Sequence, residues 1–184
     1  MATGTLARTA RGIDRVCGWL NQLVTTAVGA LLATIFTLLM VQVVMRYVVR
    51  FPLAWIEELT AFLAAYLALW GASVCLRNGS HVIVDTFYRM YPEVLRRIVT
   101  IFIYIVAIYF AYALYIGGMR LAELGAAEVS SSGYFNMYWP RLAVVSGAAL
   151  IAVQAANLLF QAVASWFTGE PYYGGIHRRV TDSG

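Results

Sequence analysis

Four long apolar runs constrain this chain more than any other feature of its sequence. The first of them, residues 20–45, contains no charged residue. A membrane-spanning helix needs about 20 consecutive apolar residues, and this run exceeds that length. The chain is 61% hydrophobic and 12% charged, whereas an average soluble protein carries about 25% charged residues. The sequence therefore predicts an all-α integral membrane protein.

We expect four transmembrane helices within a single domain, residues 1–184. Their predicted boundaries are residues 20–45, 59–76, 98–119 and 142–167. The remaining parts are an N-terminal segment at residues 1–19, a central connection at residues 77–97 and a polar tail at residues 168–184.

Arginine supplies all 13 basic residues of the chain and indicates its orientation. Four spans place both termini and the central connection on the same side of the membrane. Nine arginines fall on that side and four on the other. The positive-inside rule therefore predicts that both termini lie in the cytoplasm.

The central connection carries polar residues at every fourth position. These are His81, Asp85, Arg89 and Glu93. Such spacing is typical of one stripe along a helix. Because proline is disfavoured inside a helix but accepted in its first turn, Pro92 should separate this stripe from the next span. We expect an amphipathic interfacial helix at about residues 81–90 on the cytoplasmic side, with Glu93 opening the third span.

Small residues recur along one side of the second span. Ala64, Ala68 and Ala72 are four residues apart, with Gly71 beside them. Such a pattern lets two helix backbones approach closely, so we interpret it as a face for packing against a partner subunit. The fourth span has a similar group at Ala148, Ala152, Ala155 and Ala156. The alternative is that alanine is simply common in membrane helices.

Charged residues gather at the first outward connection. Glu57 and Glu58 are adjacent, so on a helix they point about 100° apart and cannot share one proton. We expect them to complement the dipole at the start of the second span and to pair with Arg46 and Arg50. Trp55 is placed as an interface anchor. A functional alternative is that these residues contact a partner on the outer face.

The spans lack the residues that membrane chemistry usually requires. None has a charged residue in its middle, and none contains histidine. Carriers that handle ions alone usually bury ionisable groups, and haem proteins commonly use histidine ligands. Cys17 and Cys75 form no metal-binding or redox motif, and His81 with Asp85 supplies only two ligands. We predict no catalytic residue, cofactor, metal or nucleic-acid partner.

Several short motifs follow one another in a fixed order: Arg46-Tyr47, Trp55-Ile56-Glu57-Glu58, Gly71, Arg77, Gly79, His81 and Asp85. This ordered set resembles the small membrane subunit of TRAP (tripartite ATP-independent periplasmic) transporters, the DctQ-like family. The resemblance implies a non-catalytic scaffold subunit in the bacterial inner membrane. It also implies structural roles for Arg77, Gly79, His81 and Asp85, the last two fastening the interfacial helix.

The same resemblance implies partners that this sequence does not contain. A large, elevator-type membrane subunit would hold the coupling sodium and the substrate, commonly an organic or sugar acid. A periplasmic binding protein would deliver that substrate, and membrane lipids would surround the complex. Two other classes stay open from the residues alone: a four-span anchor or electron-transfer subunit, and a homo-oligomeric small exporter. Both usually need ionisable or metal-ligating residues within the spans, which are absent here.

Overall fold

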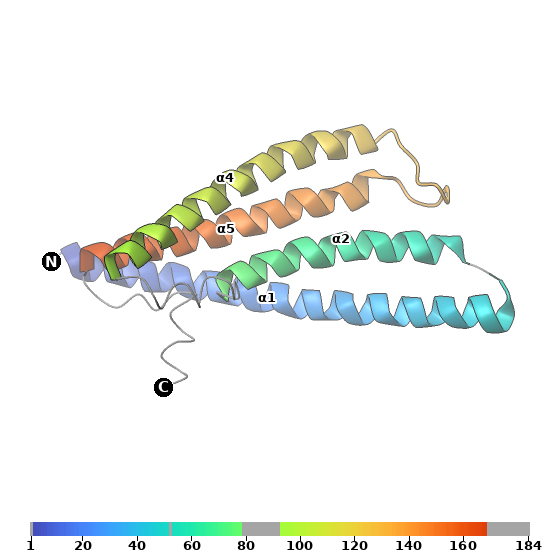
Figure 1. Ribbon diagram of the computed structural model, residues 1–184, viewed down its shortest axis with the longest axis horizontal. Helices are drawn as coiled ribbons and strands as arrows, with labels where there is room; N and C mark the ends of the chain where they lie inside the picture. Colours follow the sequence, from blue (N-terminus) through green and yellow to red (C-terminus); the bar gives the residue numbers. More distant parts are fainter. Residues whose placement is uncertain (1, 52, 79–92, 169–184) are drawn as a thin grey trace.

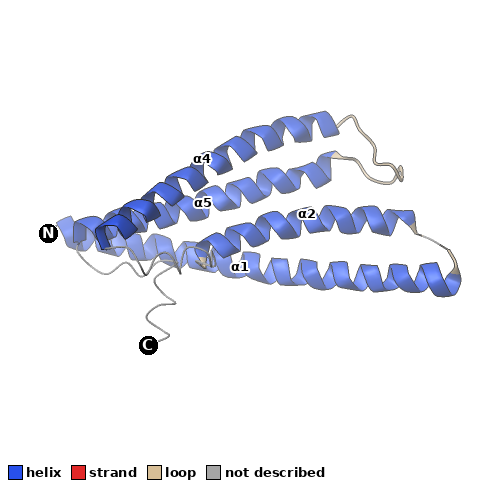
Figure 2. Ribbon diagram, viewed as in Figure 1, coloured by secondary structure: helices blue, strands red, loops and turns tan. Residues whose placement is uncertain are grey.

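The protein is a bundle of long helices. The computed structural model describes residues 2–51, 53–78 and 93–168. Its elements are helix α1 (Ala2–Val44), the π-helical turn η1 (Met45–Val49), and helices α2 (Ala54–Arg77), α4 (Glu93–Gly125) and α5 (Tyr138–Thr168). Figure 2 shows loops that join α1 to α2 and α4 to α5. The described part contains one isolated β-bridge, between Val129 and Asn136, and no longer strand.

Four helices are long and apolar enough to cross a membrane, which confirms the predicted fold class. These candidate spans are Arg15–Val49, Ala54–Arg77, Ile98–Gly125 and Tyr138–Ala164. The first three spans extend beyond their predicted runs, whereas the fourth begins earlier than predicted, at Tyr138, and ends at Ala164 rather than at residue 167. Residues 2–19 are likewise continuous with the first span, since α1 is one helix from Ala2.

The described part of the third span begins at Glu93, and the predicted interfacial helix is not covered. Helix α4 is described from Glu93 onward, and Pro92, which was predicted to separate the two helices, lies outside the described residues. The helix expected at residues 81–90, together with Gly79, His81 and Asp85, lies outside the described residues.

Helix α5 is the centre of the bundle and contacts each of the other three helices. Its contacts with α2 join residues that are 73 to 77 positions apart, so α2 and α5 run parallel. The hydroxyl of Tyr66 donates a hydrogen bond to the carbonyl oxygen of Trp139 over 2.6 Å. Further along the same pair, the Arg77 guanidinium donates to the side-chain carbonyl of Gln154 over 3.1 Å.

The two hairpins are staggered along the bundle axis (Figure 1). Arg77 ends α2 level with Gln154, whereas α5 continues to Thr168, which is about 20 Å further at 1.5 Å per residue. At the other end, α2 reaches beyond the start of α5, and the α4–α5 connection packs against it. We call this the connection end of the bundle, and the end with the N-terminus the terminal end.

Small residues of α5 form the interior of the bundle. Ala148 and Ala155 have no exposed surface, and a Cβ atom added to Gly147 would lie 2.5 Å from the Cβ of Leu69 on α2. A Cβ added to Gly118 on α4 would lie 2.9 Å from a methyl group of Val144 on α5. The expectation that the small residues of the fourth span face a partner subunit is therefore wrong for Ala148 and Ala155, because they pack within this chain.

Candidate functional site

Helix α2 exposes a stripe made of small side chains. All exposed residues of α2 from Ala61 to its end at Arg77 are alanines or cysteine: Ala61, Ala64, Ala68, Ala72 and Cys75. We call these five residues the small-residue ridge. From Ala61 to Cys75 the ridge advances 14 residues in four intervals. The mean interval is about 3.5 residues, which is the sequence repeat of helices that pack with a left-handed crossing.

Gly71 lies beside the small-residue ridge and is half-buried. A Cβ atom added to it would meet nothing within 4 Å. The predicted packing residues Ala64, Ala68 and Ala72 thus lie on one exposed face, with Gly71 beside it, and none of these alanines is buried by the rest of the described chain.

The exposed face of α4 is also apolar, but its side chains are large. Its most exposed aromatic residues are Phe102 (64%), Tyr109 (73%), Phe110 (57%) and Tyr112 (62%). Large apolar side chains fill the irregular space between lipid chains, whereas small ones leave room for another helix backbone. The two faces therefore differ in the size of their side chains rather than in their polarity.

Glu58 fixes the α4–α5 connection to the start of α2. The backbone N–H of Ser131 donates a hydrogen bond to one Glu58 oxygen over 3.0 Å, and the hydroxyl of Ser132 donates to the other. Phe62 and Phe135 add an edge-to-face contact with ring centroids 6.0 Å apart. Residues 126–137 therefore form a loop whose conformation is held by contacts with α2.

Glu57 points away from that loop and accepts a hydrogen bond from Gln42 of α1 over 3.4 Å. The predicted ion pairs of Glu57 and Glu58 with Arg46 and Arg50 are wrong. Both arginines are exposed and form no ion pair with either glutamate.

The backbone between α1 and α2 explains why these pairs do not form. The helix widens into the π-helical turn η1, and Arg50 ends that turn in the left-handed conformation, with φ of 59°. This places Arg46 and Arg50 on the exposed tip of the connection. Trp55, predicted as an interface anchor, is half-buried at the start of α2.

Polar side chains link three helices near the terminal end of α2, and the residues on α5 form the buried part of this polar cluster. Besides the bond between Arg77 and Gln154, Asn21 of α1 donates to the side-chain oxygen of Asn78 over 3.5 Å. Gln154 and Asn157 on α5 are 1% and 4% exposed. Of the four motif residues expected to be structural, the structure describes only Arg77, and it places that residue in this cluster.

The polar residues of α5 were not predicted from the sequence. Gln154, Asn157 and Gln161 are spaced three and four residues apart within an apolar run, which is the signature of one polar stripe on a helix. That pattern could have predicted the cluster. Amide side chains carry no charge, so a search for charged residues in the spans did not detect them.

The described side chains join helices to one another and do not assemble a reactive centre. Within residues 2–51, 53–78 and 93–168, no three His, Cys, Asp or Glu side chains come together as possible metal ligands. The thiols of Cys17 and Cys75 are not joined, and the first is buried whereas the second is exposed.

Comparison with known families decides what kind of protein carries these features. The model of the family described as "Tripartite ATP-independent periplasmic transporters, DctQ component" matches residues 35–165. This chain belongs to the DctQ family. The match includes the small-residue ridge, Glu58 and the polar cluster from Arg77 to Asn157. It confirms the resemblance seen in the sequence motifs, and it makes this multi-pass membrane protein a transporter component rather than an enzyme.

One curated relative extends the comparison. The DctQ chain is 26% identical over 144 residues to the sialic acid TRAP transporter permease protein SiaT of Haemophilus influenzae (strain 86-028NP). The aligned region covers 76% of this chain but 23% of that relative. The DctQ chain therefore corresponds to about a quarter of the length of the relative.

Proposed function

We propose that this DctQ chain is the scaffold subunit of a sodium-driven TRAP transporter that takes up organic or sugar acids. In this proposal the coupling sodium and the substrate bind to a large membrane subunit, and a periplasmic binding protein delivers the substrate. The DctQ family supports the assignment, and the relative named for sialic acid, itself a sugar acid, supports the substrate class.

The orientation proposed for the subunit follows the distribution of arginine. The terminal end of the bundle faces the cytoplasm and the connection end faces the periplasm, with the protein in the bacterial inner membrane. The nine-to-four division of arginines between the two sides supports this orientation.

The observation that carries the proposal is the small-residue ridge of α2. An exposed row of alanines without large neighbours leaves a helix surface that another helix can approach closely. The repeat of about 3.5 residues favours a partner helix that crosses α2 at roughly 20°. We assign this partner to the large membrane subunit, with Gly71 at the edge of the contact.

A scaffold must be rigid if another part of the complex moves against it. The centre of this bundle meets that need, because α5 packs closely on both α2 and α4 through glycine and alanine. The Glu58 contacts at one end and the Arg77–Gln154 hydrogen bond at the other hold the hairpins in register. In this proposal the interfacial helix at residues 81–90, with His81 and Asp85, braces the subunit at the cytoplasmic surface.

The connection end is the surface proposed to contact the binding protein. It exposes Arg46 and Arg50, which have no acidic partner within the described chain, and the side chain of Tyr134, which is 76% exposed. Unpaired surface charges accelerate the encounter between oppositely charged partners. The substitution Arg50→Glu should therefore lower uptake when the binding protein is limiting and leave it unchanged when that protein is saturating, with Arg50→Lys as the control. Uptake unchanged at both concentrations would contradict the contact.

Co-purification in mild detergent tests the scaffold assignment. We expect the chain to retain a membrane protein with many more spans, and uptake to require both chains and the binding protein. Saturable transport of an organic acid by this chain alone in liposomes would contradict the scaffold role.

A further inference from the structure

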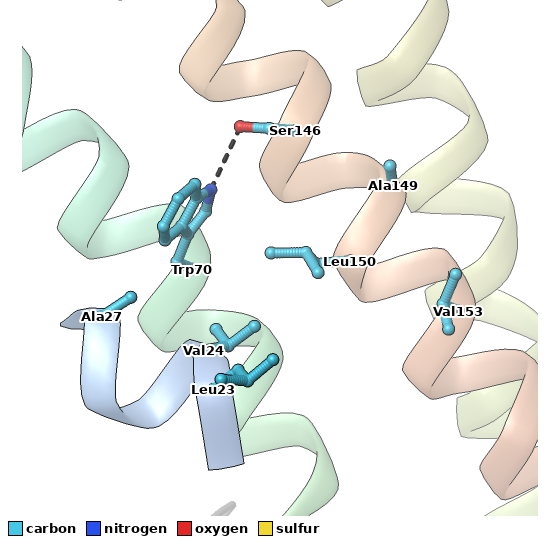
Figure 3. Close-up of a pocket in the computed structure, with 8 residues that line it drawn as sticks. All are labelled: Leu23, Val24, Ala27, Trp70, Ser146, Ala149, Leu150 and Val153. Carbon is cyan, nitrogen blue, oxygen red and sulfur yellow. Dashed lines mark hydrogen bonds between the residues drawn. The ribbon is translucent and has the colours of Figure 1, made fainter. Parts of the chain in front are cut away.

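An open apolar groove lies on the side of α2 that faces away from the small-residue ridge. Its volume is about 450 Å³. Figure 3 shows side chains from three helices around it, and the lining residues are Leu23, Val24, Ala27, Trp70, Ser146, Ala149, Leu150 and Val153. Leu23, Val24 and Ala27 come from α1, Trp70 comes from α2, and the other four come from α5.

The groove offers no free hydrogen-bonding side chain to a ligand. Its two polar side chains are bonded to each other, since the Trp70 indole N–H donates to the Ser146 hydroxyl over 3.1 Å. That hydroxyl in turn donates to the carbonyl oxygen of Ala143 over 3.1 Å. An occupant that carries polar groups at this depth would lose their hydration without compensation. The groove therefore fits a hydrocarbon chain.

Positive charge lies on the terminal side of the groove. Arg15 is exposed on α1, eight residues before Leu23 and therefore about 12 Å away along the helix. Toward the N-terminus the sequence adds Arg11 and Arg8 against one acidic residue, Asp14, so this stretch is basic overall. A ligand that places an apolar chain in the groove and an anionic group beside Arg15 would match both features.

We propose that the groove binds one acyl chain of an anionic phospholipid of the cytoplasmic leaflet, whose phosphate contacts Arg15. The choice of leaflet rests on the orientation proposed above. Arginine forms strong, often bidentate hydrogen bonds with phosphate. The acyl chain would also cover apolar surface of α1, where Leu23 is 49% exposed.

The shape of the groove favours a lipid chain over a helix of another subunit. Branched side chains line it, among them Leu23, Leu150 and Val153, and they keep a second backbone at a distance. Close helix approach needs small residues at the contact, and on α2 these lie on the opposite face. A flexible chain can instead follow the irregular space between α1 and α5.

Native mass spectrometry can count the phospholipids that the full chain retains, together with any partner that co-purifies. The protein would be extracted from nanodiscs containing equal amounts of phosphatidylglycerol and phosphatidylcholine with the same acyl chains. Ala149→Phe fills the groove, and Ala113→Phe adds the same bulk on the exposed face of α4 as a matched control. We expect wild type and Ala113→Phe to retain one more phosphatidylglycerol per chain than Ala149→Phe.

Further variants distinguish the contribution of the lipid headgroup from that of the acyl chain, and distinguish loss of lipid binding from misfolding of the protein. Arg15→Gln should lower retention of phosphatidylglycerol several-fold and remove its advantage over phosphatidylcholine. Ala27→Phe, which fills the groove from α1, should reproduce Ala149→Phe, and both should elute from gel filtration as wild type does. Equal retention by wild type and both filled variants would overturn the proposal.

Two other outcomes would also overturn the lipid assignment. If Ala149→Phe retained the lipid but no longer bound a protein partner or a second copy of the chain, the groove would be a protein-binding site. Equal retention of the two lipids by wild type would remove the role of Arg15. Failure of the scaffold proposal can be distinguished from failure of the lipid proposal. In that case the wild-type chain would not co-purify with the large subunit, whatever number of lipids it retains.

Discussion

The exposed faces of α2 and α4 are both apolar, yet they are built differently. From Ala61 onward α2 exposes only alanine and cysteine, whereas α4 exposes phenylalanine, tyrosine and branched aliphatic residues. Hydropathy alone does not separate the two faces, because lipid and protein interiors are similarly apolar. Side-chain size does separate them, since only the α2 face allows a second helix backbone to come close.

In the proposed function, this difference divides the surface of the subunit into two parts. The small-residue ridge is the expected interface with the large subunit, and the aromatic face of α4 is the expected lipid contact.

Adding bulk to the ridge should disrupt the complex. The double variant Ala64→Phe/Ala68→Phe should retain at least tenfold less large subunit, because overpacking a close contact costs about 1–3 kcal/mol per site. The matched control is Ala113→Phe on the exposed face of α4, which should retain it as wild type does. The measurement is the ratio of the two subunits after affinity purification, and equal losses in both variants would remove the distinction between the faces.

Two glycines allow a comparison of a tightly packed position with an open one in the same bundle. Gly147→Ala places a methyl group against Leu69 in a contact that has no space for it, so it should destabilise the bundle by about 1–3 kcal/mol. Gly71→Ala meets nothing within 4 Å and should leave the isolated chain unchanged. Thermal unfolding in detergent measures both, and equal melting temperatures would contradict the packing described for α5.

The two adjacent glutamates should differ in their effect on the connection end. Glu58→Ala removes the acceptor of the Ser131 and Ser132 hydrogen bonds, so residues 126–137 should be cleaved several-fold faster by an added protease. Glu57→Ala removes only the longer contact with Gln42 and should cleave at the wild-type rate. Identical rates in the two variants would show that Glu58 does not hold the loop.

The smallest effect is expected where a hydrogen bond joins two helices that already pack well. Ser146→Ala removes the acceptor of the Trp70 indole and should cost about 0.6 kcal/mol, the average for hydrogen bonds between membrane helices. A loss above about 2 kcal/mol would exceed the range measured for such bonds, and would assign the Trp70–Ser146 pair a larger role than packing. Unfolding in detergent with increasing denaturant measures this change.

The sequence predicted the fold well because hydropathy governs membrane helices directly. Charge-free runs predicted the four spans. The family motifs were recognisable as well. The predicted packing alanines of α2 are exposed together, as an interface would require, but their contact with a partner remains a prediction.

The contacts between distant segments could not be predicted from the sequence. Glu58 was expected to pair with arginines nearby in the sequence, but the stagger of the hairpins brings it to serines more than 70 residues later. The same stagger sets Arg77 beside Gln154. Local patterns do not encode how far one hairpin slides along another, because that offset depends on which glycines and alanines allow close packing.

The central claim is tested most directly by a cryo-electron microscopy structure of the complex purified through this chain. The account predicts a helix of the large subunit along the small-residue ridge, with its axis within about 8 Å of the axis of α2 at Ala68, and lipid against Tyr109 on α4. A structure in which the ridge faces lipid and the aromatic face of α4 is covered by protein would contradict it.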